Sequence, residues 1–121
     1  MIHKQKPVDT YFLEDFIDVT KIENETFERC IFTSKNNEQY RQFPLFQFEK
    51  CIFKNVRFEG NFYIDNAFIE CTFDDVRFNV KFGGDLVKCT IGWNGLEFNN
   101  SYTSGRITQM HFSRHLSIFT K

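Results

Sequence analysis

The segment from Phe43 to Phe78, FPLFQFEKCIFKNVRFEGNFYIDNAFIECTFDDVRF, decides the fold, because an aromatic residue returns at every fifth position. The series is Phe43, Phe48, Phe53, Phe58, Tyr63, Phe68, Phe73 and Phe78. An earlier stretch keeps the period at Phe12, Ile17, Ile22, Phe27 and Phe32. Neither an α-helix, with about 3.6 residues per turn, nor a strand, with a period of about 2, places every fifth side chain on one side. A chain that turns a corner every five residues does, so these side chains are expected to point inward.

A longer repeat lies over the short one. The corresponding positions Phe12, Phe32, Phe53, Phe73, Ile91 and Phe112 are 20, 21, 20, 18 and 21 residues apart. Self-similarity at such a period predicts a solenoid, whose turns bury their apolar side against each other. The residue two before each inward position is also expected to point inward. Asn61 and Asn66 occupy two such positions and would need hydrogen-bond partners.

A small residue, a variable residue and a phenylalanine begin several of these units, as in Cys51-Ile52-Phe53 and Cys71-Thr72-Phe73. This pattern resembles the pentapeptide-repeat family. The resemblance implies an all-β, right-handed quadrilateral β-helix with about five to six coils of ~20 residues. We expect a flexible tail at 1–8, the β-helix at 9–106, and a C-terminal coil, cap or dimerisation segment at 107–121. Loops are expected where the register breaks, near 33–42, 83–84 and 92–95.

Length and charge limit the function classes. A chain of 121 residues with a net charge of −1 predicts one domain and no direct binding of nucleic acid. The first residues lack the apolar stretch of a signal peptide, and no apolar run reaches the length of a membrane span. We therefore expect a cytoplasmic protein.

The residues offer little for catalysis or for metal binding. Cys30, Cys51, Cys71 and Cys89 follow the coil period, so they are expected to be core thiols in one ladder rather than disulfides or zinc ligands. His111 and His115 are four residues apart, but the repeat predicts an extended backbone there and an outward His111. We expect no enzyme activity, no cofactor and no metal site.

The surface is where function is expected. In the five-residue pattern, the residue before each inward position faces solvent. The partner-binding candidates are Tyr11, Ile31, Ile52, Arg57, Phe62, Arg77, Phe82 and Trp93. Arg57 and Arg77 are expected one coil apart, where like charges repel unless an acid or a partner intervenes. Trp93 lies between two glycines, and aromatic and Arg side chains concentrate at binding hot spots. The C-terminal candidates for dimerisation are Leu116, Ile118 and Phe119, and the family resemblance implies dimers through C-terminal coils.

Two functions remain open. The first is a non-catalytic module that binds and neutralises or modulates a protein partner through apolar patches, as an immunity protein, an antitoxin or a phage-type inhibitor does. The second is implied by the family resemblance: a DNA mimic that binds DNA gyrase or topoisomerase and protects or inhibits it. Residues 43–83 carry six acids against five bases, whereas an imitation of DNA should be clearly acidic.

Overall fold

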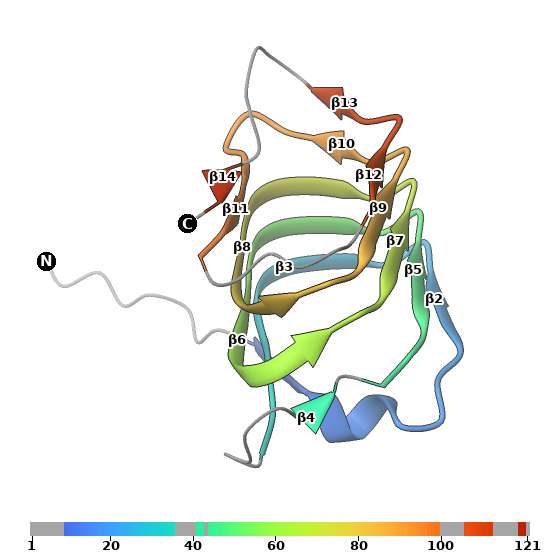
Figure 1. Ribbon diagram of the computed structural model, residues 1–121, viewed down its shortest axis with the longest axis vertical. Coiled ribbons are helices and arrows are strands. Elements are labelled where there is room, and N and C mark those ends of the chain that lie inside the picture. Colours follow the sequence, from blue (N-terminus) through green and yellow to red (C-terminus); the bar gives the residue numbers. More distant parts are fainter. Residues whose placement is uncertain (1–8, 36–40, 43, 100–105, 113–118, 121) are drawn as a thin grey trace, which may run out of the picture.

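The computed structural model shows a parallel β-solenoid of about four turns (Figure 1). It describes residues 9–35, 41–42, 44–99, 106–112 and 119–120, so the tail predicted for 1–8 lies outside the described residues. The predicted all-β solenoid is confirmed, with fewer turns than the five to six expected from the sequence. The elements are β1 (Asp9–Phe12), the 3₁₀-helix η1 (Leu13–Phe16), β2 (Lys21–Glu23), β3 (Thr26–Thr33), β4 (Arg41–Gln42), β5 (Gln47–Glu49), β6 (Ile52–Ile64), β7 (Ala67–Ile69), β8 (Thr72–Phe82), β9 (Asp85–Val87), β10 (Thr90–Ile91), β11 (Leu96–Phe98), β12 (Ile107–Thr108), β13 (His111–Phe112) and β14 (Phe119–Thr120).

The strands form two parallel sheets on different sides of the solenoid. One sheet has the order β1-β3-β6-β8-β10-β13, with β4 paired to β6 and β11 paired to both β8 and β14. The other sheet has the order β12-β9-β7-β5-β2, and its strands rise along the right-hand edge of Figure 1. Strands β12 and β13 therefore continue the two ladders as far as residue 112.

Corners form two residues after an inward side chain, where the backbone enters the left-handed region. This is true of Lys50, Asn55, Glu70 and Asp75, whose φ angles lie between 52° and 58°. Such a conformation costs a non-glycine residue about 1–2 kcal/mol, so the stacked turns must supply the compensation. The two sides that these corners join carry inward residues five positions apart, as the sequence predicted.

Stacked aromatic rings fill the interior. Phe58 lies over Phe32 with ring centroids 4.6 Å apart, and Phe78 lies over Phe58 at 4.5 Å. Phe48 and Phe68 stack in the same way at 4.8 Å. Each fully buried phenylalanine contributes roughly 1.5–3 kcal/mol, and each ring pair about 0.5–1.5 kcal/mol more. This column of rings is therefore the main stabilising feature of the fold.

The five-residue period fails on the remaining side of each turn. From Phe78 to Leu86 every second residue is buried, which is ordinary strand alternation. On the same side, the preceding turn has two residues more than this one. The register of β6 against β8 therefore shifts between Glu59 and Tyr63. Gly60, at φ 147°, lies in this bulge. The inward Tyr63 and Asn61 predicted from the period are wrong: Tyr63 is half-buried and Asn61 is exposed.

The turn from β3 to β6 is longer than the period suggested, whereas the turn from β1 to β3 takes 21 residues. Phe27, and not Phe32, lies beside Phe53, a separation of 26 residues along the chain. The next turn, from Phe53 to Phe73, takes 20. The six extra residues lie between Phe32 and Gln47, five of them before Arg41, instead of the single extra one that the spacing indicated. As a result, Cys30 pairs with Val56 and does not lie in the column that contains Cys51, where the sequence placed it.

The two glycine-containing segments differ in kind. No break occurs at Gly83–Gly84, because the alternation of buried residues continues from β8 into β9. Glycine is needed at position 84 because the backbone of the preceding turn lies very close to it. A Cβ there would overlap the carbonyl oxygen of Asn66. The bulge predicted for 92–95 is confirmed. Gly95, at φ 80°, closes a turn between β10 and β11.

Candidate binding surface

A column of outward residues crosses the first sheet and makes one candidate surface. Residues of successive turns pair in the order Thr26, Ile52, Thr72, Thr90 and His111. We call this column and its flanking residues the Ile52 face. Ile52 is 37% exposed and His111 is exposed, as the sequence predicted for both.

Trp93 occupies the corner where the Ile52 face ends. Its side chain is 59% exposed. The turn beneath it is fixed by the backbone N–H of Asn94, which donates to Oδ1 of Asp74 at 2.8 Å, and by that of Gly95, which donates to the Gly92 carbonyl at 3.1 Å. A Cβ on Gly92 would lie 2.8 Å from Cγ of Asp74, so glycine is required for this approach. The backbone that carries the indole is therefore held by hydrogen bonds.

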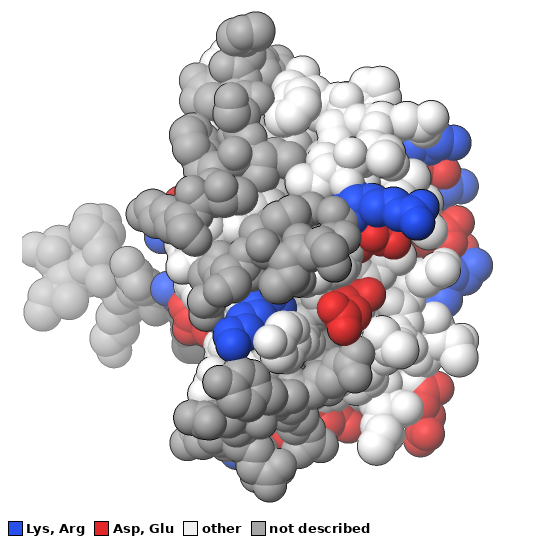
Figure 2. Space-filling model, viewed as in Figure 1, with Lys and Arg blue, Asp and Glu red and all other residues white. Residues whose placement is uncertain are grey.

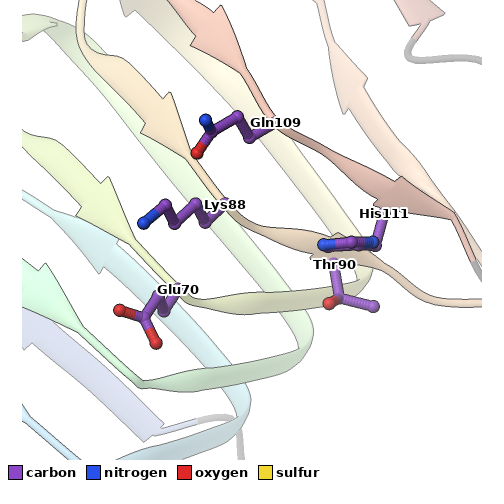
Figure 3. A pocket seen from close by; sticks show the side chains of 5 residues that line it. All are labelled: Glu70, Lys88, Thr90, Gln109 and His111. Carbon is purple, nitrogen blue, oxygen red and sulfur yellow. The ribbon is translucent and has the colours of Figure 1, made fainter.

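An open polar hollow lies at the opposite margin of the Ile52 face. Figure 3 shows Glu70, Lys88 and Gln109 projecting side by side from successive turns, with Thr90 and His111 across from them. The hollow has a volume of about 530 Å³, and within the described part of the chain these five side chains form no hydrogen bond or ion pair. They offer a carboxylate, an ammonium group and neutral donors and acceptors to a bound surface.

Arg57 and Arg77 lie one turn apart, as predicted, but acids already compensate their charges. Nε of Arg57 is 3.7 Å from Glu59, and Nε of Arg77 is 4.0 Å from Glu97. The four side chains are between 28% and 54% exposed, so each pair contributes little to stability. The arginines therefore do not require a partner.

Four predicted surface residues are placed differently from expectation. Phe62 and Phe82 are buried, at 3% and 0% exposure, because this side alternates with a period of two; their assignment to an exposed surface is wrong. Tyr11 is partly buried and stacks on Phe32 with centroids 5.1 Å apart, so it caps the core. Ile31 pairs with Arg57 instead of lying in the column of Ile52.

The dimerisation candidates are only partly described. Leu116 and Ile118 lie outside the described residues, as does His115. The backbone of Phe119 lies in β14, where it pairs with Glu97 of β11.

The cysteines act as core residues. All four are free and buried, and Cys51, Cys71 and Cys89 form one column while Cys30 stands apart from it. The thiol of Cys71 donates to the carbonyl of Phe48 one turn away at 3.4 Å, and Cys89 donates to Phe68 at 3.1 Å. The neighbouring thiols of Cys51 and Cys89, together with burial, raise the pKa of Cys71 well above its usual range. These thiols link successive turns.

Asn66 is a buried polar residue of the core, as its position predicted. Its Nδ2 donates to the carbonyls of Pro44 and Phe46, each at 2.9 Å.

Charges of both signs alternate on the surface. Figure 2 shows acidic and basic side chains interspersed along the right-hand edge, where Figure 1 places β2, β5, β7 and β9. Corner residues Lys50, Glu70 and Lys88 follow one another on successive turns. The described residues contain no helix long and apolar enough to cross a membrane. They also contain no cluster of three or more potential metal ligands.

Two exposed residues were missed by the sequence reasoning. Ile17, expected inward, is 72% exposed, and Leu45, which follows Pro44, is 67% exposed. The spacing of three between Leu13 and Phe16 could have indicated the helical turn η1, which buries those two residues and turns Ile17 outward. Leu45 falls outside the five-residue period, and nothing in the sequence marks it.

No protein-family model matches this chain, and no curated protein matches its sequence.

Proposed function

We propose that this chain is a non-catalytic binding module that neutralises or modulates a protein partner through the Ile52 face and the Trp93 corner. An immunity protein, an antitoxin and a phage-type inhibitor are the classes that such a module fits. The proposal is supported by a surface that is already formed, because a partner that binds it causes little loss of conformational entropy.

The single observation that carries the proposal is the exposure of Trp93 on a turn fixed by hydrogen bonds. Leaving an indole in water forgoes the free energy that its burial would provide, so a turn built to hold it outward is expected to serve binding. Tryptophan is among the residue types most enriched at interface hot spots. Ile52 adds a second apolar contact on the adjoining face.

The family assignment is also part of the proposal. We infer that the chain is a divergent relative of the pentapeptide-repeat proteins with a cytoplasmic location. Inward residues five apart at Phe48, Phe53 and Phe58, with left-handed corners after the first two, support this relationship. The side of each turn with a period of two departs from the family pattern. Four free cysteines suit a reducing compartment.

Imitation of DNA is the weaker alternative. Duplex DNA presents closely spaced negative charge along its whole length. Here bases interrupt the acids on successive turns, as Lys50 and Lys88 flank Glu70, and Glu97 is paired with Arg77. The interspersed charges of Figure 2 agree with this pattern. Binding to gyrase or topoisomerase therefore remains an outcome of the test below.

The test is affinity capture with tagged wild-type protein and with the variants Trp93→Ala and Ile52→Asp, in low and high salt. Gln47→Ala, an exposed change on the other sheet, is the matched control. We expect one prey protein that resists high salt, is retained by the control and is lost from both other variants. The purified prey should then bind the Trp93 variant at least about tenfold more weakly.

Two results would count against the proposal. If Trp93→Ala and Ile52→Asp both retained the same prey protein, the Ile52 face and the Trp93 corner would not be its binding surface. Recovery of topoisomerase subunits only in low salt would instead favour DNA imitation, because screening weakens charge-driven binding. For either result, the variants must melt near the wild-type temperature, so that a loss of folding is excluded as the cause.

A further inference from the structure

Five polar side chains surround the hollow beside the Ile52 face, and within the described part of the chain none of them has a hydrogen-bond or ion-pair partner. They are Glu70, Lys88, Thr90, Gln109 and His111. Groups of this kind are hydrated in the free protein, so a ligand that displaces the water must supply matching donors, acceptors and charge. The chemistry of the five groups therefore indicates what the hollow can bind.

The backbone that carries these side chains is held by contacts between turns. Glu70, Lys88 and Gln109 are corner residues of successive turns, with φ angles of 53° or 54°. The N–H of Glu70 donates to the carbonyl of Val87 at 2.8 Å, and the N–H of Lys88 donates to that of Thr108 at 3.0 Å. The three side chains therefore leave the backbone in the same direction, about one strand spacing of 4.8 Å apart. Figure 3 shows them on one side of the hollow, with the other two, from the paired strands β10 and β13, across from them.

The unbalanced charge of the hollow is positive. Glu70 has a lysine on the turn before it and another on the turn after it, Lys50 and Lys88. Lys88 has this acid on one side only, because the corner of the next turn is the uncharged Gln109. The ammonium group of Lys88 is therefore less compensated than the carboxylate of Glu70.

The hydrogen-bonding groups favour the same sign of ligand. Four of the five side chains, all except Glu70, can donate a hydrogen bond. A carboxylate carries one negative charge and only accepts hydrogen bonds, so it matches Lys88 and the donors around it. A phosphate group carries about −1.5 to −2 charges, and Glu70 would repel it more strongly.

We propose that the hollow binds the carboxylate of an acidic side chain on the protein partner of the Ile52 face. Lys88 pairs with this carboxylate, Gln109 and the two side chains across the hollow donate to it, and Glu70 limits the bound charge to one. Thr90 and His111 belong both to the hollow and to the Ile52 face, so one partner can cover both. An open, polar lining suits a side chain that projects from a protein, whereas pockets for small molecules are mostly apolar.

This inference rests on the proposed function for the source of the carboxylate, but its first test does not need the partner. The probe is a glutamate residue blocked at both ends, titrated into the isotope-labelled full chain at constant ionic strength. Blocked glutamine is the neutral control, and blocked phosphoserine tests for phosphate. We expect saturable NMR shifts of the Lys88, Thr90 and Gln109 amides with a dissociation constant on the order of 10 mM for blocked glutamate. Blocked phosphoserine should bind more weakly, and blocked glutamine should not saturate.

Three variants test the roles of the charges. Lys88→Gln should weaken the binding of blocked glutamate about fivefold or more, because it removes the ion pair. Glu70→Gln should strengthen it about twofold or more, because it removes a like charge. Lys54→Gln makes the same change of charge at an exposed lysine of β6 that does not line the hollow, and it should bind as the wild type does.

Several results would overturn the inference. Wild-type affinity in Lys88→Gln, or an equal loss in Lys54→Gln, would mean that no specific site exists. Weaker binding in Glu70→Gln would show that the hollow does not select an anion, and tighter binding of blocked phosphoserine would exclude the carboxylate as the preferred group. If the prey protein captured above bound Lys88→Gln as tightly as the wild type and was lost from Trp93→Ala, the proposed function would stand. The partner would then not supply a carboxylate to the hollow.

Discussion

At the scale of single residues, Gly84 shows how tightly successive turns approach each other. A Cβ at this position would overlap the carbonyl oxygen of Asn66, a backbone atom that cannot rotate away. Gly84→Ala should therefore destabilise the protein by about 2 kcal/mol or more. Gly95→Ala is the matched control, because its Cβ would meet nothing within 4 Å and only its φ of 80° is unfavourable, at about 1 kcal/mol. Urea unfolding of both variants measures the difference, and a smaller loss for Gly84→Ala would contradict the close approach.

Cys30 predicts a dependence of stability on pH. Burial raises the pKa of its thiol. The unfolded chain then releases this proton at a lower pH than the folded chain does, so deprotonation favours the unfolded state. The contribution is fully present below the unfolded thiol pKa of about 8.5 and is lost as pH rises through the folded value.

The measurement is the free energy of unfolding from pH 7 upward, for wild type and Cys30→Ala. The variant should be less stable at neutral pH, but its stability should fall less steeply above about pH 8.5. Parallel curves would show that other groups cause the alkaline loss.

At the scale of elements, the turn from Gly92 to Gly95 is the part of the candidate surface whose stiffness matters. Asp74→Ala removes the acceptor for the N–H of Asn94 and should cost about 1 kcal/mol, whereas Asp74→Asn keeps an acceptor and should cost less. The anisotropy decay of Trp93, the only tryptophan of the chain, reports the local motion. Faster motion is expected in Asp74→Ala alone. Equal decays in all three proteins would mean that other contacts fix the turn.

The bulge in β6 allows a test of which residues set the register. Glu59 pairs with Asn79 and Tyr63 with Lys81, so β6 has two residues more than β8 over this stretch. Deleting Gly60 and Asn61 should make the pairing continuous, leaving a folded protein that loses less than about 3 kcal/mol. Deleting Lys54 and Asn55 instead removes a corner and should prevent folding. Circular dichroism and thermal melting distinguish the two, and failure of the first deletion to fold would show that the bulge is required.

The sides of the turn differ in how far their sequence predicts them. Phe48, Phe53 and Phe58 lie five apart because each corner consumes a fixed number of residues, so the period reveals both sides and corners. Between Phe58 and Phe68 the chain has no such corner, and ordinary alternation buries Phe62 while Tyr63 turns outward. Tyr63 coincides with the five-residue period by chance, which reversed the predicted orientation of this side. The pairing of Phe27 with Phe53 could not be predicted from the sequence either, because the repeat does not specify the length of the loop between these two residues.

At the scale of the whole molecule, the candidate surfaces were less predictable than the core. Trp93 was found because glycines flank a large aromatic residue, a local pattern. Ile17 is exposed because η1 buries Leu13 and Phe16 in its place, and no repeat unit contains such a helical turn. Arg57 and Arg77 looked unbalanced because the prediction compared them only with each other, whereas Glu59 lies two residues after Arg57 and Glu97 pairs with Arg77 on the next turn. Surface function thus depends on contacts between turns that a single period does not describe.

The order of the strands predicts a gradient of local stability along the solenoid. β7 is paired on both sides, by β5 and β9, whereas β2, of the same length, is paired by β5 alone among the described strands. Opening β2 breaks one ladder and exposes the half-buried Ile22, while opening β7 breaks two ladders and exposes the fully buried Phe68. Amides of β7 should therefore exchange with deuterium at least about tenfold more slowly than those of β2, because local opening free energies follow burial and pairing. Mass spectrometry of peptides covering each strand measures this, at two protein concentrations. Equal protection that appears only at the higher concentration would mean that a second copy covers β2, and equal protection at both would contradict the gradient.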